Sequence, residues 1–328
     1  MDFEKIFKEF TDKRVGVIGD LMLDTYWWGH VERISPEAPV PVVSLDRREY
    51  RIGGAGNVAL NLASLGAQVS VFSVLGKDDD GSVLKDLMQK AHILIPHIVE
   101  SADRISTNKT RIISRNQQMM RLDSETTRDL SPADETRLLE HLEQYLAEEK
   151  PAMVIFEDYN KGILTEKVIR ESVTLCKKQG VFTAVDPKRK NFFSYAGVDI
   201  FKPNLIEVKQ GLNLLIDEIN LDTMKDIHIK LQEKLHHSIS FVTLSEKGVF
   251  FESANQAEII PSHRRNIADV SGAGDTVIAV ASLVYASTRD VKLMAQVANI
   301  AGGLVCEEVG TVAIDKKKLL RECLLLLK

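Results

Sequence analysis

The sequence contains the run Asp269-Val270-Ser271-Gly272-Ala273-Gly274-Asp275-Thr276, which continues into an apolar stretch over residues 277–284. The apolar stretch predicts a buried helix, and the small residues Gly272, Ala273 and Gly274 let an anion approach the backbone just before it. In the first turn of that helix, the Asp275 carboxylate can accept the proton of a hydroxyl group while nearby amides stabilise a phosphoryl group in transfer. The alternative is structural: Asp275 would be an N-terminal cap, and the glycines would only shape a turn.

Around this run, short β-branched segments alternate with helical patterns along most of the chain. We expect buried strands at residues 15–18, 69–74, 153–156, 181–185 and 241–244. Helices are predicted between them, most clearly at residues 57–65, 131–150, 166–179 and 222–236. This order predicts an α/β fold with a mostly parallel sheet flanked by helices.

Two segments interrupt the alternation. Residues 26–45 contain three prolines, Pro36, Pro39 and Pro41, and residues 104–122 alternate polar with apolar side chains. We expect the two segments to pair as a small antiparallel sheet that projects from the core. Ligands of open α/β sheets bind beyond the carboxyl ends of the strands, so this small sheet is placed to act as a lid. Residues 1–328 are therefore interpreted as a single domain with an inserted lid.

The composition restricts the class of protein. The chain has 328 residues, of which 44% are hydrophobic, and its formal net charge of -5 argues against bulk binding to nucleic acid. No stretch approaches the roughly 18 uninterrupted apolar residues of a transmembrane helix, and residues 1–10 lack a signal-peptide pattern, so we expect a cytoplasmic protein without membrane contact. Cys176, Cys306 and Cys323 show neither metal-ligand spacing nor a disulfide pattern.

Two further segments offer groups for a nucleotide and a metal. Lys202-Pro203-Asn204-Leu205-Ile206-Glu207 opens a predicted helix, and Glu207 is a candidate magnesium ligand that acts mainly through water. The alternative is a capping box with Asn204 at the N-cap. The segment Thr243-Leu244-Ser245-Glu246-Lys247-Gly248 follows an apolar strand, where it could border a nucleotide or be a bare turn.

Polar groups for a sugar are expected near the first strand and in the lid. Asp20 and Asp24 follow that strand and can accept hydrogen bonds from sugar hydroxyls, although they could equally cap a loop. Residues 53–59 are glycine-rich and precede a helix, but they follow polar residues rather than a first strand and so do not match the dinucleotide fingerprint. Arg115 belongs to a basic cluster that could clamp a phosphate or could be an exposed strand face.

Taken together, residues 53–59 and 269–275 resemble the two signatures of the ribokinase-like (phosphofructokinase B, PfkB) family of carbohydrate kinases. Residues 202–207 and 243–248 are similar to its Asn-x-x-Glu and nucleotide-loop motifs. The resemblance covers nearly the whole chain and implies a Rossmann-like core with a small β-sheet lid, ATP and Mg²⁺ as cofactors, and phosphorylation of a sugar hydroxyl. The resemblance does not decide whether a monovalent cation is also required. Lid pairing in relatives implies a homodimer.

A closer resemblance is to the branch of this family formed by the heptose-phosphate kinases of ADP-heptose biosynthesis. It is carried by residues 33–42, by residues 114–118 with 121–123, and by Asp158-Tyr159-Asn160-Lys161-Gly162. It implies transfer of the ATP γ-phosphate to the anomeric O1 of D-glycero-β-D-manno-heptose 7-phosphate, giving the 1,7-bisphosphate for lipopolysaccharide core assembly. In many such kinases a nucleotidyltransferase domain follows; here the chain ends at Lys328, so we expect phosphorylation without adenylylation.

The resemblance also implies roles for individual residues. Asp275 matches the catalytic base, and the anion hole is matched by Gly272, Ala273 and Gly274. The nucleotide and magnesium region is matched by Asn204, Glu207, Thr243, Ser245, Gly248 and Asn299, although Ser245 stands where the wider family commonly has glycine. The sugar-binding positions are matched by Asp20, Asp24, Gly54 and Asn57, and the heptose or its 7-phosphate by Arg115, Asn116, Lys161 and Lys188.

Three other functions fit parts of this pattern. A kinase of the same fold for another sugar phosphate, a nucleoside or a ketohexose is disfavoured by residues 115–123. A catalytically silent relative that binds sugar and nucleotide is disfavoured by the intact set of residues 272–275. An NAD-dependent oxidoreductase is disfavoured because the dinucleotide fingerprint is misplaced.

Overall fold

The computed structural model describes residues 2–115, 117–216, 218–254 and 256–327. Its main sheet is built from β1 (Arg14–Gly19), β4 (Gln68–Gly76), β5 (Ile98–Ser101), β8 (Met153–Glu157), β9 (Phe182–Asp186), β10 (Ile200–Phe201), β11 (Ile239–Thr243), β12 (Val249–Ser253) and β13 (Gln256–Ile260). Over the described residues these strands lie in the order β13-β12-β11-β10-β9-β8-β1-β4-β5. The strands from β5 to β11 are parallel, whereas β12 and β13 add an antiparallel edge.

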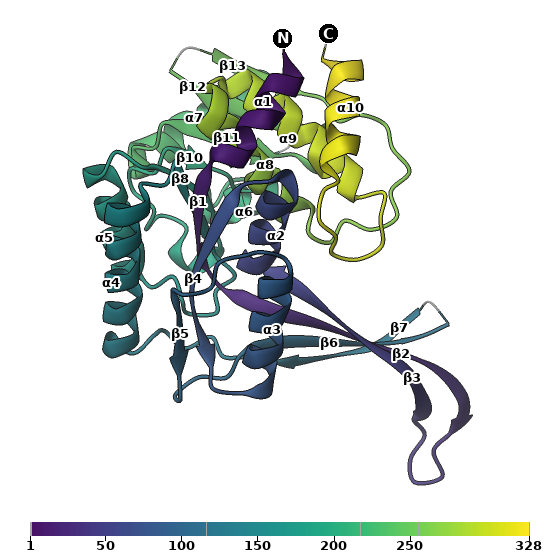
Figure 1. Cartoon of the computed structure of the whole chain (residues 1–328). Helices are drawn as coiled ribbons and strands as arrows, with labels where there is room; N and C mark the ends of the chain where they lie inside the picture. Colours follow the sequence, from purple (N-terminus) through teal and green to yellow (C-terminus); the bar gives the residue numbers. More distant parts are fainter. Residues whose placement is uncertain (1, 116, 217, 255, 328) are drawn as a thin grey trace.

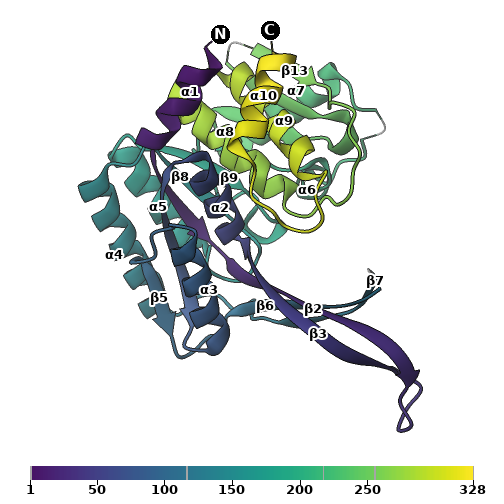
Figure 2. The ribbon, with the colours of Figure 1, turned by 45° about the vertical axis from the view of Figure 1, so that its right-hand side comes forward.

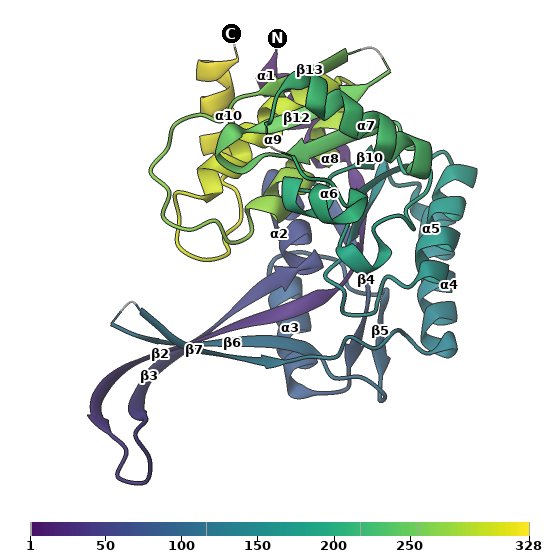
Figure 3. The same ribbon diagram turned by 180° about the vertical axis from the view of Figure 1, so that it is seen from behind.

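Helices cover both faces of this sheet, which explains why its central strands are apolar throughout (Figures 1 and 3). One face packs against α1 (Phe3–Glu9), α2 (Ala55–Leu65), α3 (Asp79–Lys90), α8 (Ala273–Thr288), α9 (Val291–Val305) and α10 (Lys316–Leu326). The other face packs against α4 (Pro132–Glu149), α5 (Glu166–Lys178), α6 (Leu205–Leu212) and α7 (Leu221–Leu235). The predicted parallel α/β architecture is thus present.

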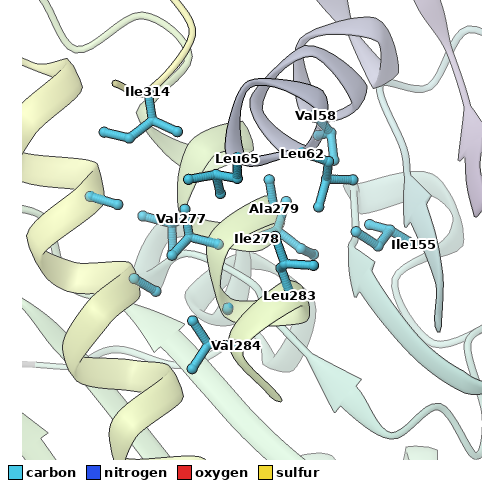
Figure 4. Packing of buried hydrophobic residues seen from close by; sticks show 14 of the residues in the cluster. Val58, Leu62, Leu65, Ile155, Val277, Ile278, Ala279, Leu283, Val284 and Ile314 are labelled. Atoms are coloured by element: carbon cyan, nitrogen blue, oxygen red, sulfur yellow. The ribbon is translucent and has the colours of Figure 1, made fainter. Parts of the chain in front are cut away.

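Helix α8 lies deep in the first of these two layers. Its residues Ile278, Ala279 and Leu283 are fully buried. They pack among side chains of α2 and Ile155 of β8 (Figure 4). A helix that is apolar on nearly all sides is held in place by its whole surroundings. The packing of these later turns fixes the position of α8, and with it the position of the first turn that carries Asp275.

A second sheet projects from this body, as Figure 2 shows in profile. It consists of β2 (Leu21–Ile34), β3 (Pro41–Gly54), β6 (Thr107–Ser114) and β7 (Gln117–Ser124), in the order β3-β2-β6-β7. We call these four strands the lid. Residues 26–45 and 104–122 contribute to it as expected, but β2 and β3 continue inward to Leu21 and Gly54. The expected antiparallel arrangement is wrong in one respect, because β2 and β6 run parallel.

Within the described residues, no helix combines the length and apolar character needed to cross a membrane. The predicted helices at residues 57–65, 131–150, 166–179 and 222–236 correspond to α2, α4, α5 and α7, with ends that differ by at most a few residues. At the start of α4, Ser131 accepts a hydrogen bond from the backbone of Asp134 and Pro132 occupies the first turn.

Candidate active site

Asp275 lies in the first turn of α8 with only 4% of its surface exposed. Both of its carboxylate oxygens accept a hydrogen bond from another part of the chain. Asn57 of α2 donates from Nδ2 to Oδ2 at 2.7 Å, and the hydroxyl of Tyr159, which follows β8, donates to Oδ1 at 2.7 Å. Burial raises the pKa of Asp275 to about 6, against the opposing effect of these two hydrogen bonds. The arrangement holds a carboxylate whose pKa suits a proton acceptor near neutral pH.

The turn before α8 requires its glycine. Gly272 has φ of 76°, in the left-handed region, and a Cβ there would lie 2.8 Å from Nδ2 of Asn57. Ala273 and Gly274 follow as the first residues of the helix, where backbone N–H groups have no partner inside the helix. This turn therefore combines a close backbone approach with a helix N-terminus, as anion binding requires.

Beneath this turn lies a group of charged side chains at the ends of three adjacent parallel strands. Glu157 ends β8, Asp186 ends β9, and Lys202 follows β10 directly. Lys202 is 2% exposed, and its Nζ lies 2.8 Å from Oδ2 of Asp186. Oxygens of Glu157, Asp186 and Asp275 lie within 4.8 Å of one another. Sequence reasoning missed Glu157 and Asp186, and it quoted Tyr159 and Lys202 within motifs without giving either a role in the site. The signal that the four share is their position at or just past a strand end.

The pKa values in this group are set by burial and by mutual charge. Burial raises the pKa of Glu157 well above its usual range, and the nearby carboxylates of Asp186 and Asp275 add to the increase. Burial also acts to raise the pKa of Asp186, but the ammonium groups of Lys188 and Lys202 outweigh it and hold that pKa below its usual value. Asp186 is thus the ionised partner of the two lysines.

Asn204 and Glu207 form the capping box that was the structural alternative for this segment. Asn204 is the N-cap of α6, and its side chain accepts a hydrogen bond from the Glu207 N–H at 2.9 Å. Oε2 of Glu207 accepts the Asn204 N–H at 2.8 Å, and Oε1 lies 2.6 Å from Nζ of Lys188. Lys188 also lies 3.7 Å from Asp186. A chain of alternating charges therefore connects Glu207 with the carboxylates below Asp275.

The predicted nucleotide loop lies beside this segment, because Thr243 forms a bridge with Asn204. Ser245 is exposed and has φ of 55°, a conformation that explains the preference of the wider family for glycine there. Gly248 has φ of 95°, and a Cβ on it would lie 2.0 Å from the carbonyl oxygen of Ile260. Asn299 of α9 is almost buried and donates to the carbonyl oxygen of Pro261 at 2.9 Å.

At the predicted sugar end, the Asp20 side chain binds backbone groups of the protein. Its two oxygens accept the backbone N–H groups of Tyr159, Lys161 and Ile163 at 2.8, 3.0 and 3.2 Å. Asp20 thereby fixes the loop that carries Tyr159. Gly54 has φ of 58°, and a Cβ there would lie 2.4 Å from the Asp20 carbonyl oxygen, which explains the glycine.

The root of the lid carries a second set of ion pairs. Asp24 of β2 is 4% exposed, and its Oδ1 lies 2.6 Å from Nη1 of Arg111 on β6. Nζ of Lys161 lies 2.7 Å from Oε1 of Glu125. The predicted sugar-binding side chains of Asp24 and Lys161 are therefore each paired with an opposite charge from the lid or its edge.

Arg115 lies away from these residues, at the turn between β6 and β7. In the register of the two strands, Lys109 of β6 lies opposite Asp24 of β2, and Ser114 lies opposite Gly29. Ser114 is therefore five residues further from the core than the level of Asp24, and Arg115 follows Ser114. At about 3.3 Å per residue this is roughly 16 Å. The structure does not bring Arg115 to Asp24, and Asn116 lies outside the described residues.

Comparisons with known proteins agree with this geometry. A sequence model of the pfkB family of carbohydrate kinases matches residues 12–318. The bifunctional protein HldE of Sulfurimonas denitrificans is 36% identical over 311 residues, covering 95% of this chain and 64% of that protein. The bifunctional protein HldE of Geobacter sulfurreducens is 38% identical over 301 residues, covering 91% of this chain and 60% of that protein. The chain thus spans less than two thirds of the length of these curated relatives.

Solved structures share the fold. Phosphofructokinase-2 from Escherichia coli in complex with potassium matches with a TM-score of 0.79 and 17% identity, covering 96% of this chain and 100% of that chain. Ribokinase from Arabidopsis thaliana complexed with ribose and ATP matches with a TM-score of 0.73 and 16% identity, covering 94% and 99%. These similarities confirm the predicted ribokinase-like α/β fold.

Proposed function

Because the chain belongs to the pfkB family of carbohydrate kinases and is thus an ATP-dependent sugar kinase, we propose that its acceptor is D-glycero-β-D-manno-heptose 7-phosphate. The γ-phosphoryl group of ATP would pass to the anomeric O1, giving the 1,7-bisphosphate used in ADP-heptose and lipopolysaccharide core biosynthesis. The observation that carries the proposal is the buried Asp275 carboxylate beside the Gly272 turn. The similarity to bifunctional HldE proteins supports the heptose-phosphate branch, to which residues 33–42 and 114–123 pointed.

In this proposal Asp275 accepts the proton of the sugar hydroxyl as that oxygen attacks the γ-phosphorus. Asn57 and Tyr159 orient the carboxylate, because each of its oxygens is held by one of them at 2.7 Å. The backbone N–H groups of Gly272 and Gly274 would stabilise the negative charge that spreads over the transferring group, whereas the Ala273 N–H donates to the carbonyl oxygen of Val270 at 3.3 Å. Asp20 acts as a positioning residue, since it binds the backbone of the loop that carries Tyr159.

Magnesium would neutralise charge on the phosphates of ATP, and we expect Glu207 to hold it. Both oxygens of Glu207 already have a partner, the Asn204 N–H and the Lys188 ammonium, which favours contact through water. The same segment, together with Thr243, Ser245 and Gly248, forms the proposed nucleotide side, with Asn299 beside the adenine. Asp24, Gly54, Lys161 and Lys188 belong to the proposed sugar side.

We further propose that the chain forms a single kinase domain that pairs as a homodimer through the lid. Strand β7 is exposed along its whole length. Several large apolar side chains of the lid are open to solvent, among them Ile34 at 60%, Met120 at 55% and Leu122 at 46%. A second lid would cover them. Arg115, at the turn between β6 and β7, is better placed for such an interface than for a clamp in its own site.

The test is a coupled ADP-release assay with ATP, Mg²⁺ and a panel of acceptors: heptose 7-phosphate, fructose phosphates, ribose and nucleosides. Selective turnover of the heptose phosphate is the expected result. Turnover of another acceptor would keep the kinase and discard the heptose assignment. Binding of sugar and nucleotide without any turnover would contradict the proposed chemistry and favour a silent relative.

A further inference from the structure

Arg51 of β3 connects the lid with a segment near the other end of the chain. Its Nη1 donates hydrogen bonds to the carbonyl oxygens of Val309 and Thr311, at 3.1 and 3.3 Å. Both residues belong to the connection between α9 and α10, residues 306–315, which we call the C-terminal loop. The proposed kinase chemistry gives Arg51 no part. This contact between the lid and the body therefore needs its own explanation.

The C-terminal loop approaches Arg51 so closely that only glycine fits between them. Gly310 has φ of 73°, and a Cβ on it would lie 2.5 Å from Nη1 of Arg51 and 3.3 Å from the hydroxyl oxygen of Tyr26. The ring of Tyr26, on β2, lies 4.9 Å from the Arg51 guanidinium carbon, and a guanidinium over an aromatic ring is attracted to it. Two lid strands thus hold the guanidinium against the loop.

On its other side, the C-terminal loop lies against the segment that leads into the Gly272 turn. The Gly310 N–H donates to Oδ2 of Asp269 at 2.9 Å, and the Asp269 N–H donates to the carbonyl oxygen of Cys306 at 3.2 Å. A Cβ on Gly272 would lie 3.2 Å from Cγ2 of Thr311. A displacement of the loop would therefore reach the turn that is proposed to receive the phosphoryl group.

On the lid side, Arg51 is tied to Trp28 through one carboxylate. Nε of Arg51 donates to Oε1 of Glu49 at 2.7 Å, and the indole Nε1 of Trp28 donates to Oε2 of Glu49 at 3.2 Å. Burial acts to raise the pKa of Glu49, but the Arg51 guanidinium and the other donors outweigh it and hold that pKa below its usual value. A continuous path of hydrogen bonds thus runs from Trp28 to Asp269.

We propose that Arg51 is a positioning residue that couples the position of the lid to the geometry of the Gly272 turn through the C-terminal loop. A guanidinium suits this role because its donors are fixed in one plane, so it can bind the Glu49 carboxylate and the loop carbonyls at once. Nucleotide at the turn then shifts the lid, and an acceptor under the lid shifts the turn, since coupling between two sites is reciprocal. The inference rests on the proposed placement of ATP at the turn, but not on which sugar is the acceptor.

The experiment uses Trp28 as a reporter of the lid. The chain has two tryptophans, Trp27 and Trp28, both on β2, so the full chain with Trp27→Phe keeps one. This parent protein is titrated with Mg²⁺ and a non-hydrolysable ATP analogue, without sugar, while calorimetry measures nucleotide binding separately. Binding should change the emission of Trp28. With Arg51→Met added, the protein should still bind nucleotide, but the emission change should be lost.

Two further variants make the result specific to Arg51. Arg51→Lys keeps the charge but cannot hold Glu49 and two carbonyls together, so its emission change should be smaller than that of the parent. Arg47→Met is the matched control: Arg47 lies 4.7 Å from the ring of Trp28, and its Nη1 lies 3.1 Å from Oε2 of Glu49. These described contacts of Arg47 lie within the lid. Arg47→Met should therefore alter the resting emission but retain the response to nucleotide.

Hydrogen exchange tests the coupling without any ligand. In Arg51→Met the Gly310 amide, which donates to Asp269, should exchange about tenfold faster or more, because loss of a hydrogen bond to a charged group is worth at least that much in local opening. The Thr223 amide is the internal reference. It donates to a side-chain oxygen at the same distance of 2.9 Å, at the start of α7, and should exchange at its wild-type rate.

Three results would overturn the proposal. The first is nucleotide binding that leaves the emission of the parent unchanged. The second is an emission change that survives in Arg51→Met or is lost equally in Arg47→Met. The third is unchanged exchange of the Gly310 amide in Arg51→Met. A protein that binds no nucleotide by calorimetry would instead contradict the proposed kinase reaction, and hydrogen exchange would still decide whether Arg51 holds the loop.

Discussion

Replacing Tyr159 with phenylalanine removes one of the two hydrogen bonds that hold Asp275. The Tyr159 hydroxyl donates to Oδ1 of Asp275 at 2.7 Å, and a hydrogen bond to a charged group is worth about 1.5–3 kcal/mol. The bond stabilises the ionised carboxylate, so its loss raises the pKa of Asp275. Since about 1.4 kcal/mol corresponds to one pKa unit, the pKa should rise from about 6 to about 7–8.

A general base acts only when it is ionised, so the acid limb of the rate profile should move to higher pH by the same amount. At pH 7 the rate should fall about two- to tenfold, and it should recover above about pH 9. Burial and the nearby carboxylates raise the pKa of the Tyr159 hydroxyl well above its usual range, so in the wild type it remains a donor throughout. The assay measures single-turnover phosphorylation across this pH range at saturating ATP and Mg²⁺, so that product release does not mask the chemical step.

Tyr195→Phe is the matched control. The Tyr195 hydroxyl is also buried and donates to a buried carboxylate, Oδ2 of Asp158, at 2.8 Å. Loss of that bond should lower the free energy of unfolding about as much as Tyr159→Phe does. It should leave the acid limb of the pH–rate profile at its wild-type position. Equal acid limbs in wild type and Tyr159→Phe would refute the reasoning. A loss of rate that is the same at every pH would also refute it, because it would mean that Tyr159 affects geometry rather than proton affinity.

Three other variants test separate parts of the structure. Asp275→Asn should lower kcat at least about 10²-fold while ATP binding, followed by nucleotide titration, stays nearly intact; near-wild-type turnover would contradict its assignment as the base. Lys202→Met leaves the Asp186 carboxylate buried without its closest cation and should lower the free energy of unfolding in urea by about 3–5 kcal/mol. Met120→Lys places a charge on the exposed lid face and should reduce the molar mass measured by light scattering; an unchanged dimer mass would exclude that face as the interface.

The sequence predicted the main architecture because its signals are local. Residues 153–156 and 241–244 are mostly apolar runs of strand length; the first lies within the buried strand β8, and the second overlaps β11, which begins two residues earlier and ends at Thr243. The parallel pairing of β2 with β6 was not predictable in this way. The pairing joins segments that are far apart in the chain. The residues of neither segment indicate whether its neighbour runs parallel or antiparallel to it.

The site residues also fall into those that a local sequence pattern reveals and those that it does not. The glycine turn and Asp275 stand out because small residues directly before an apolar helix form an unusual pattern. Glu157 and Lys202 each appear in the sequence as the first charged residue after a short apolar segment, a pattern that many proteins contain. They become informative only when the strand order places β8, β9 and β10 side by side, so that their ends converge beneath Gly274. Their convergence is a property of the topology.

Two of the four connections between the lid and the core are very short. On one side β1 ends at Gly19 and β2 begins at Leu21; on the other, β3 ends at Gly54 and α2 begins at Ala55. The two connections are tied together, because the Ala55 N–H donates to the carbonyl oxygen of Asp20 at 3.0 Å. Asn57, which holds Asp275, lies only two residues beyond Ala55, and the Asp20 side chain binds the loop of Tyr159. If the lid closes over the acceptor as proposed, a tilt of β2 and β3 would reach both donors to the Asp275 carboxylate, and binding of the acceptor would be coupled to alignment of that carboxylate.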